Sequence, residues 1–355
     1  MAARMAMAAG LLAVAHVAHA FQRETISIAT YDGPNAAVYV PDAIAGNAKT
    51  DQKLSLVLEL SGRCQSGAAI ERAMNFRDLV DSEHFVLVVP EARRNTRPCP
   101  TCGPPFFGGA GCQAWAASPA CCANDGSRAL NATTGQLARS SWEPRDDSAY
   151  LAELIQTASQ RYGVDRQRVY VFGYSAGGFM AHRLACDNPK KIAAVFSLTG
   201  GGVIEEGLCS AFERSSKFTS PVAIVHAHPL RDAVFPAAGG TFDSITTPPA
   251  NATVSAWATH NGCEGGVKRV EGLDLFNDGG MFRRRGNAEP VMDTERAIYD
   301  SCSDGGTTES WSIPQGTHVG VISQNKPQLT EAVVQFFKAN PKPVDLLPKS
   351  RRVPS

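Results

Sequence analysis

The side chain most suited to chemistry in this chain is a serine set between small residues. Ser175 lies at the centre of Gly173-Tyr-Ser-Ala-Gly177, after the short apolar run 168–172 and before 176–188, which has apolar residues at helical spacing. A strand, a tight turn and a helix in this order lift a hydroxyl above a sheet edge and aim free helix N–H groups at a developing oxyanion. This setting predicts a nucleophilic serine. The alternative is a plain glycine-rich turn, since the five-residue pattern alone also arises by chance.

A serine nucleophile needs an imidazole base, and the imidazole needs a carboxylate that fixes its tautomer. Asp232 is the candidate acid, because it follows the strand-like run 222–228 in a turn that ends at Pro236. His318 is the candidate base, because it follows the strand-like run 310–313 and precedes the closing helix. The chain order serine, acid, histidine is the one used by α/β-hydrolases.

Other acids and histidines fit these two roles less well. The rival carboxylates have weaker strand context: Glu205, Glu206 and Asp243. The rival histidines lie in helices, in a turn before a strand, or ahead of the acid in chain order: His84, His182, His226, His228 and His260. We therefore expect packing or solvent-facing roles for these side chains.

Two convergent backbone N–H groups must bind the oxyanion. One is expected from Ala176, directly after the serine. The other is expected from the loop 60–66 after an early strand, where Gly62 permits a tight backbone and the amide of Arg63 or Cys64 is the donor. We take Arg63 as the candidate; an ordinary turn at 60–66 is the alternative.

Strand-like and helix-like segments alternate along the chain, around these candidate residues. A hairpin is expected around the turn at 32–34, with strands at 54–60, 85–90, 168–172, 192–198, 222–228 and 310–313, and helices at 69–81, 146–162, 254–262 and 329–339. Alternation of this kind predicts an α/β fold with a mostly parallel central sheet and helices on both faces. No repeat or composition shift marks a second domain. A single catalytic domain over 21–341 is expected, followed by a flexible tail over 342–355.

The first twenty residues have the pattern of a secretory signal peptide. Arg4 is followed by an apolar run over 5–17 and by the small-x-small cleavage signal Ala18-His-Ala20. An uncleaved anchor is the alternative, and no later segment is apolar enough to span a bilayer. We therefore expect a secreted, extracellular protein with no membrane contact after signal cleavage.

Ten cysteines suit an oxidising compartment and predict disulfide-stapled loops. Five of them crowd into the irregular segment 93–145: Cys99, Cys102, Cys112, Cys121 and Cys122. The Cys99–Cys102 spacing would suit a metal or redox site, but an adjacent cysteine pair makes a poor second ligand set. A stapled loop is the favoured interpretation, and no metal and no cofactor are expected.

Two further features bear on modification and partners. Asn131 and Asn251 each begin an Asn-Ala-Thr sequon, which is an acceptor for N-glycosylation where the host modifies secreted proteins. The 34 lysines and arginines balance the 34 aspartates and glutamates, so no basic field is available for a phosphate backbone. Nucleic acid is therefore not an expected partner.

A longer stretch around the serine resembles a known family. Residues 161–186, RYGVDRQRVYVFGYSAGGFMAHRLAC, resemble the secreted feruloyl and acetylxylan esterases of carbohydrate esterase family one, and equally the LpqC-type polyhydroxybutyrate depolymerases. That family carries RYGVDPxRVYVTGLSAGGxMAxxLAC there. The resemblance covers residues 37–339, with further matching segments at 85–91, 232–236, 261–263 and 299–302. It implies an α/β-hydrolase fold and a disulfide between Cys263 and Cys302.

The chain departs from the family pattern beside the expected site. Ser61 replaces a histidine in the early loop, Pro229 replaces a glycine in the acid loop, and the base loop before His318 is less glycine-rich. Arg63 stands at the expected oxyanion position, where its side chain would favour an anionic or polar substrate. These departures bear on substrate preference and loop geometry more than on the three reacting side chains.

The resemblance implies a secreted serine esterase that hydrolyses carboxylic esters on a polymer or on a small ester substrate. Feruloyl or acetyl esters of polysaccharide are the first expectation, and polyhydroxyalkanoate depolymerisation is the second. A peptidase fits less well, since nothing suggests a peptide-binding domain. A catalytically inactive hydrolase fold acting as a binding protein is the alternative from a different class.

Overall fold

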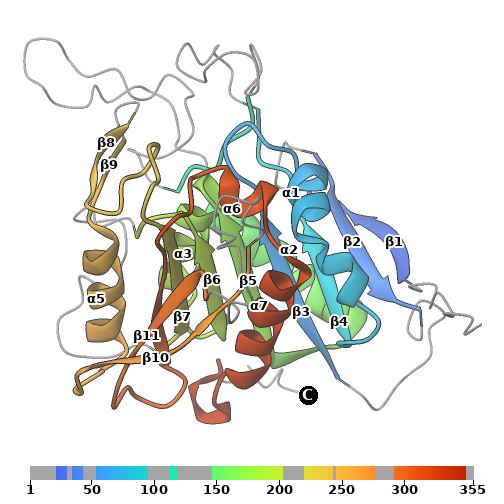
Figure 1. Cartoon of the computed structure of the whole chain (residues 1–355). Coiled ribbons are helices and arrows are strands. Elements are labelled where there is room, and N and C mark those ends of the chain that lie inside the picture. The colour runs from blue at the N-terminus through green and yellow to red at the C-terminus, as the bar shows by residue number, and fades with distance from the viewer. Residues whose placement is uncertain are drawn as a thin grey trace, which may run out of the picture.

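The computed structural model describes residues 21–29, 34–42, 53–94, 112–117, 146–202, 220–242, 245–276 and 292–348 (Figure 1). Within them, a ten-stranded sheet runs through the body in the order β1-β2-β4-β3-β5-β6-β7-β12-β11-β10. Its strands are β1 Phe21–Ile26, β2 Ala36–Pro41, β3 Leu54–Leu60, β4 Phe85–Val89, β5 Val164–Tyr174, β6 Ala194–Leu198, β7 Ala223–Pro229, β10 Val267–Leu273, β11 Thr294–Tyr299 and β12 Thr308–Ile313. A separate small hairpin joins β8 Gly240–Phe242 to β9 Ile245–Thr247.

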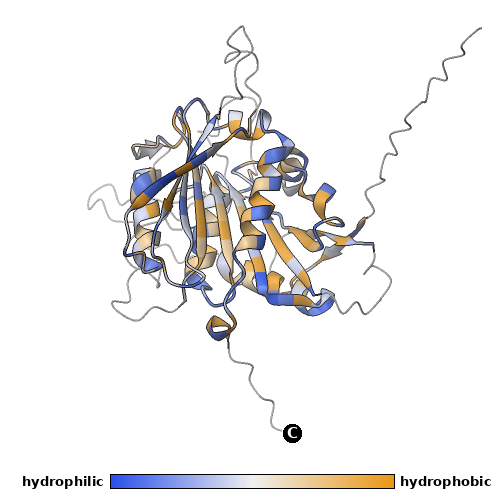
Figure 2. Cartoon of the chain, turned by 60° about the horizontal axis from the view of Figure 1, so that its bottom comes forward, coloured by the Kyte–Doolittle hydropathy of each residue, from blue (hydrophilic) through white to orange (hydrophobic). Residues whose placement is uncertain are grey.

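The centre of the large sheet is parallel and its margins are antiparallel. The strands from β4 through β3, β5, β6 and β7 to β12 pair in parallel, whereas β1, β2, β10 and β11 pair antiparallel. Strands β3, β4, β6 and β7 are buried along their whole length, as expected of parallel strands that are covered on both faces. Figure 2 shows apolar colour along these central strands.

Helices cover both faces of the sheet. Their bounds are α1 Gly67–Met74, α2 Asp147–Tyr162, α3 Ala176–Asp187, α5 Ala250–His260, α6 Gly320–Ser323 and α7 Pro327–Ala339, with 3₁₀ turns η1 Phe76–Leu79 and η2 Val344–Leu346. Apolar residues of α2 and α3, with Trp257 of α5, pack on one face. Apolar residues of α1, η1, α6 and α7 pack on the other, which is the near face in Figure 1. The predicted α/β architecture is therefore confirmed.

Most of the predicted elements are present with shifted bounds. The opening hairpin, the helix before the serine and the closing helix are all there. The helix expected over 69–81 is instead α1 followed by η1, because Asn75 adopts a left-handed conformation with φ 56° and ends the α-helix. Strands β10 and β11 were not predicted, since the exposed sequence Val-Lys-Arg-Val-Glu of β10 has no apolar alternation.

The body continues past the expected domain end at residue 341. Lys342 is only 1% exposed. Its Nζ donates to the carbonyl oxygen of Pro221, and its backbone N–H donates to Gln167 O. Arg166 also donates to Pro348 O at 2.7 Å. The tail predicted to begin at 342 is thus packed on the body as far as residue 348, because a buried ammonium and backbone hydrogen bonds hold it.

Candidate active site

Ser175 occupies a sharp turn between β5 and α3. Its backbone has φ 54° and ψ −120°, a conformation that L-residues rarely adopt. The amide of Ser175 donates to Leu198 O at 2.9 Å, which ties the turn to the neighbouring strand β6. The strand and the helix therefore hold the serine in a strained geometry that places its hydroxyl at the carboxyl edge of the sheet.

The glycines of the motif are required by close packing. A Cβ on Gly173 would collide with the carbonyl group of Gly177, and a Cβ on Gly177 would collide with the carbonyl group of Leu60 at the end of β3. Strand β5, helix α3 and strand β3 thus approach one another at backbone distance. Glycine is the residue that permits this approach around the serine.

The three predicted reacting side chains lie in one hydrogen-bonded line. His318 Nε2 is 2.9 Å from Ser175 Oγ, and His318 Nδ1 is 2.8 Å from Asp232 Oδ2. All three residues are buried, with exposed fractions of 6% for Ser175, 5% for Asp232 and 8% for His318. Because a carboxylate only accepts, Nδ1 carries the proton, and Nε2 is left to accept the serine hydroxyl proton.

Loops that follow parallel strands bring the acid and the base together. Asp232 lies in the turn after β7, and His318 lies in the loop after β12, the strand that pairs with β7. The two loops are joined by backbone hydrogen bonds from Leu230 to Ile313 and from Arg231 to Gly316, each 3.0 Å long. The second carboxylate oxygen of Asp232 accepts the amides of Val234 and Phe235 at 2.8 Å each, so both oxygens are held.

The loop predicted to supply the second oxyanion donor lies directly against the serine. A Cβ on Gly62 would stand 3.0 Å from the ring of Tyr174 and 3.3 Å from the Cβ of Ser175. Of the two predicted donors, the amide of Cys64 is engaged, since it donates to Gln113 O at 2.7 Å. Ala176 begins helix α3 immediately after the serine, where its amide belongs to the unsatisfied first turn.

Part of the predicted cysteine-rich segment braces this loop. A disulfide joins Cys64 to Cys112. The indole of the fully buried Trp115 donates to Ser61 O at 3.0 Å. Residues 112–117, which we call the brace, are therefore attached to the loop 61–64 by one covalent bond and by hydrogen bonds on either side of Arg63.

Comparisons with known proteins bear on the fold of this chain. Residues 143–245, which include Ser175 and Asp232, match the family model described as phospholipase/carboxylesterase. The solved structure of an acetyl xylan esterase from Aspergillus awamori superimposes with a TM-score of 0.51 at 14% sequence identity, covering 90% of this chain and 99% of that chain. The chain has the α/β-hydrolase fold. This fold explains why the serine, the acid and the base follow three parallel strands in that order.

One curated relative is similar in sequence over part of its length. The bifunctional acetylxylan esterase/xylanase XynS20E of Neocallimastix patriciarum is 25% identical over 202 residues, which is 57% of this chain. The matched part is 22% of that protein, so the chain spans about a fifth of the relative's length.

Sequence reasoning missed two neighbours of the hydrogen-bonded line Ser175–His318–Asp232. The hydroxyl of Tyr174 donates to the carbonyl oxygen of His318 at 2.9 Å, and the two rings lie 5.5 Å apart. Burial raises the pKa of Tyr174 far above its usual value, so the phenol keeps the proton that it donates. The ring of Phe235 meets His318 edge-on at 5.5 Å. Only the position of Tyr174 beside Ser175 offered a sequence signal.

The rival residues are placed elsewhere or lie outside the described residues. Glu205, Glu206 and Asp243 belong to the latter group. His182, His226, His228 and His260 are buried, and His84 stands in the turn before β4. None of these histidines has a recorded hydrogen bond to Ser175. Within the described ranges, no group of three or more metal-ligating side chains is found.

Some of the residues predicted to form disulfides or to be modified lie within the described residues, and others lie outside them. The Sγ atoms of Cys263 and Cys302 are 1.99 Å apart, in agreement with the pairing that the family resemblance implies. Asn251 is exposed in the first turn of α5, whereas Asn131 lies outside the described residues, as do Cys99, Cys102, Cys121, Cys122 and the signal segment 1–20. No helix in the part of the chain that the structure describes is long and apolar enough to cross a membrane.

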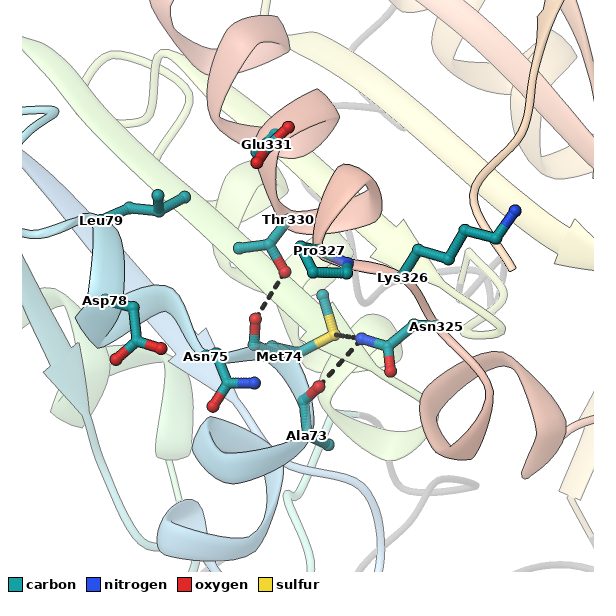
Figure 3. Close-up of a pocket in the computed structure, with 10 residues that line it drawn as sticks. All are labelled: Ala73, Met74, Asn75, Asp78, Leu79, Asn325, Lys326, Pro327, Thr330 and Glu331. Atoms are coloured by element: carbon teal, nitrogen blue, oxygen red, sulfur yellow. Dashed lines mark hydrogen bonds between the residues drawn. The ribbon is translucent and has the colours of Figure 1, made fainter. Parts of the chain in front are cut away.

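A cavity of about 150 Å³ lies apart from this site (Figure 3). It opens between α1, η1 and the start of α7, and none of its lining residues belongs to the serine, acid or base loops just described. Asn325 donates to Ala73 O at 2.9 Å across one end, and Thr330 donates to Met74 O. These bonds join α1 to the segment that enters α7, so the cavity is a packing gap between the two.

Proposed function

We propose that this protein is a serine esterase that hydrolyses carboxylic esters carried by a polysaccharide. The observation that carries the proposal is the buried line from Ser175 through His318 to Asp232, with both imidazole nitrogens in hydrogen-bond contact. A serine held in a strained turn at a helix N-terminus, with a correctly ordered base and acid, suits acyl transfer.

Each step of the proposed reaction has a residue in position. Ser175 Oγ attacks the ester carbonyl carbon while His318 Nε2 takes the hydroxyl proton, and Asp232 stabilises the imidazolium that forms. The amides of Ala176 and Arg63 bind the carbonyl oxygen as it becomes negative. His318 then gives its proton to the leaving alcohol oxygen. A water molecule, activated by His318, releases the acid and restores Ser175.

Acetyl and feruloyl esters are the proposed substrate class. The stretch 161–186 resembles carbohydrate esterase family one, and the relatives described above include an acetyl xylan esterase and a bifunctional acetylxylan esterase/xylanase. The signal-like first twenty residues and the disulfides support export to the compartment in which such polymers are met. The Arg63 side chain favours esters with polar or anionic groups near the carbonyl.

A two-stage assay tests the proposal. Wild type is expected to hydrolyse p-nitrophenyl acetate, and Ser175→Ala is expected to lower kcat by on the order of 10³-fold or more. Equal activity of the two proteins would overturn the role of Ser175 as nucleophile. No activity in either would overturn the enzymatic proposal and favour a binding protein.

The second stage measures acetate released from acetylated xylan, hydrolysis of methyl ferulate, and clearing of a polyhydroxybutyrate film. Activity on one or both of the first two supports the proposed substrate class. Activity confined to the film would identify a polyester depolymerase instead. An Arg63→Ala variant should lose more kcat/KM on acidic esters than on neutral ones; an equal loss on both would refute the role of its side chain in substrate preference.

A further inference from the structure

Two histidines lie in strand β7, which precedes the candidate acid Asp232. His226 and His228 are two residues apart in strand β7, so their side chains point to the same face of the sheet. Both are buried, with exposed fractions of 1% and 6%. His228 Nδ1 lies 3.3 Å from His226 Nε2, and His228 Nε2 lies 2.8 Å from the carbonyl oxygen of Phe235.

These contacts determine where the protons are. A carbonyl oxygen only accepts, so His228 Nε2 carries a proton and donates it to Phe235 O. In the neutral imidazole, Nδ1 of His228 is then an acceptor, and Nε2 of His226 must be the donor that faces it. The hydrogen bonds therefore run in one direction, from His226 to His228 to Phe235.

Burial keeps both imidazoles neutral. Desolvation lowers the pKa of His226 well below its usual value, and the neighbouring His228 and His182 lower it further. Desolvation also lowers the pKa of His228. The titratable groups that face the pair are His182 on α3, Asp232 in the acid turn and His318 in the base loop. A second proton on His228, at Nδ1, would face the N–H group of His226. Burial also opposes the positive charge that this proton would bring.

Phe235, which accepts the last hydrogen bond of this series, also contacts the candidate acid Asp232. Phe235 is fixed at its carbonyl oxygen by His228, while its amide donates to Asp232 Oδ1 at 2.8 Å. The other oxygen of Asp232 faces His318 Nδ1. Since the turn 232–235 is anchored at Phe235, the orientation of the carboxylate depends on the direction in which His228 donates.

We propose that His228, kept in one tautomer by His226, is a positioning residue that holds the turn 232–235 and thereby aims the Asp232 carboxylate at His318. The proposal rests on the proposed esterase function. It assigns no bond-making step to His228, which acts on the reaction only through Asp232. Its effect must therefore disappear when the Asp232 carboxylate is removed.

A double-mutant cycle tests this dependence. H228F removes both polar contacts and keeps a ring of similar size; H228Q restores one donor and one acceptor. With p-nitrophenyl acetate, H228F is expected to lower kcat about tenfold or more with KM within about twofold, and H228Q to recover most of the loss. In a D232N background, adding H228F should change kcat by less than about twofold. Equal losses in both backgrounds, or no loss in either, would overturn the proposal.

Three further measurements separate this role from folding and from the esterase proposal itself. H260F removes a buried imidazole that contacts Ser220 O at 3.2 Å outside the site, and should lower thermal stability without lowering kcat. If H228F fails to fold, H226L and H226Q serve in its place: H226L removes the donor that fixes His228, and H226Q keeps a donor, so only H226L should lower kcat. Equal kcat values of the two would count against the proposal.

The tautomer itself can be observed without activity. In ¹⁵N-histidine NMR, His228 should show a protonated Nε2 and an unprotonated Nδ1 at neutral pH; the reverse would overturn the proposal. The Ser175→Ala result stays separate, since an active Ser175→Ala protein refutes the esterase, whereas an additive cycle in an active, serine-dependent enzyme refutes only the positioning role.

Discussion

The hydroxyl of Tyr174 donates to the carbonyl oxygen of His318, so the residue before Ser175 is tied to the backbone of the candidate base. The bond joins β5 to the loop after β12, which are 144 residues apart in the chain. The bond holds the backbone of His318, whereas Asp232 contacts its imidazole. His318 is therefore held by two hydrogen bonds, one at its backbone carbonyl and one at its imidazole.

Removing the Tyr174 hydroxyl should weaken this hold. Tyr174→Phe is expected to lower the unfolding free energy by about 1 kcal/mol and kcat about fivefold, since a buried hydrogen bond contributes about this much. Tyr170→Phe is the matched control, because its buried hydroxyl has no recorded partner among the described residues. Kinetics with p-nitrophenyl acetate and urea unfolding measure both effects. Equal kcat values for the two variants would remove Tyr174 from the site.

The glycine before the nucleophile should resist substitution for steric reasons. Gly173→Ala would press a methyl group into the carbonyl group of Gly177, so we expect a loss of about 3 kcal/mol or more of unfolding free energy, or no folded protein. Gly266→Ala meets no atom within 4 Å and should change stability by less than about 0.5 kcal/mol. Thermal unfolding compares them, and a Gly173→Ala protein as stable as Gly266→Ala would contradict the packing at the elbow.

Removing either of the two described disulfides should cost similar stability, but only one of the two removals should lower kcat. Their sequence separations of 48 and 39 residues predict similar contributions, about 4 kcal/mol each by loop entropy. Replacing Cys64 and Cys112 by serine frees the brace from the loop that carries Arg63, so kcat should fall about tenfold or more. Replacing Cys263 and Cys302 should leave kcat within about twofold. Kinetics below the melting temperatures of both variants make the comparison, and equal kcat values would contradict the role of the brace.

Acid should destabilise the fold in part through His182. Burial lowers the pKa of this imidazole to about 4 from its ordinary 6.5, so the unfolded state binds the extra proton between these values. Stability is therefore complete above pH 6.5 and is lost as pH falls towards 4. His182→Gln keeps an acceptor for the indole of Trp257 and removes the titration. As pH falls over this range, the unfolding free energy of this variant should drop less steeply than that of wild type. The expected difference in slope is about 1.4 kcal/mol per pH unit, and urea unfolding at pH 5 and pH 7 measures it. An unchanged slope would refute the assignment.

The sequence alone predicted the α/β architecture, which is confirmed, and the three candidate reacting residues, which the structure brings into contact. Alternating apolar and amphipathic segments are local patterns that hold wherever the chain packs, so the parallel sheet and its covering helices were predictable. Ser175 was marked by a strand and a helix on either side, and Asp232 and His318 by their places after strand-like runs. Strands β10 and β11 escaped prediction, since their residues carry no periodic burial signal.

Only the tertiary structure decided which side chains support those three. Tyr174 and His228 contact carbonyl groups far away in the chain or across a turn, and no spacing in the sequence records which carbonyl a hydroxyl or imidazole will reach. The engagement of the Cys64 amide by Gln113 O was likewise visible only in the structure. Hydrogen bonds are short and directional, so they are fixed only when packing brings distant segments within about 3 Å of one another.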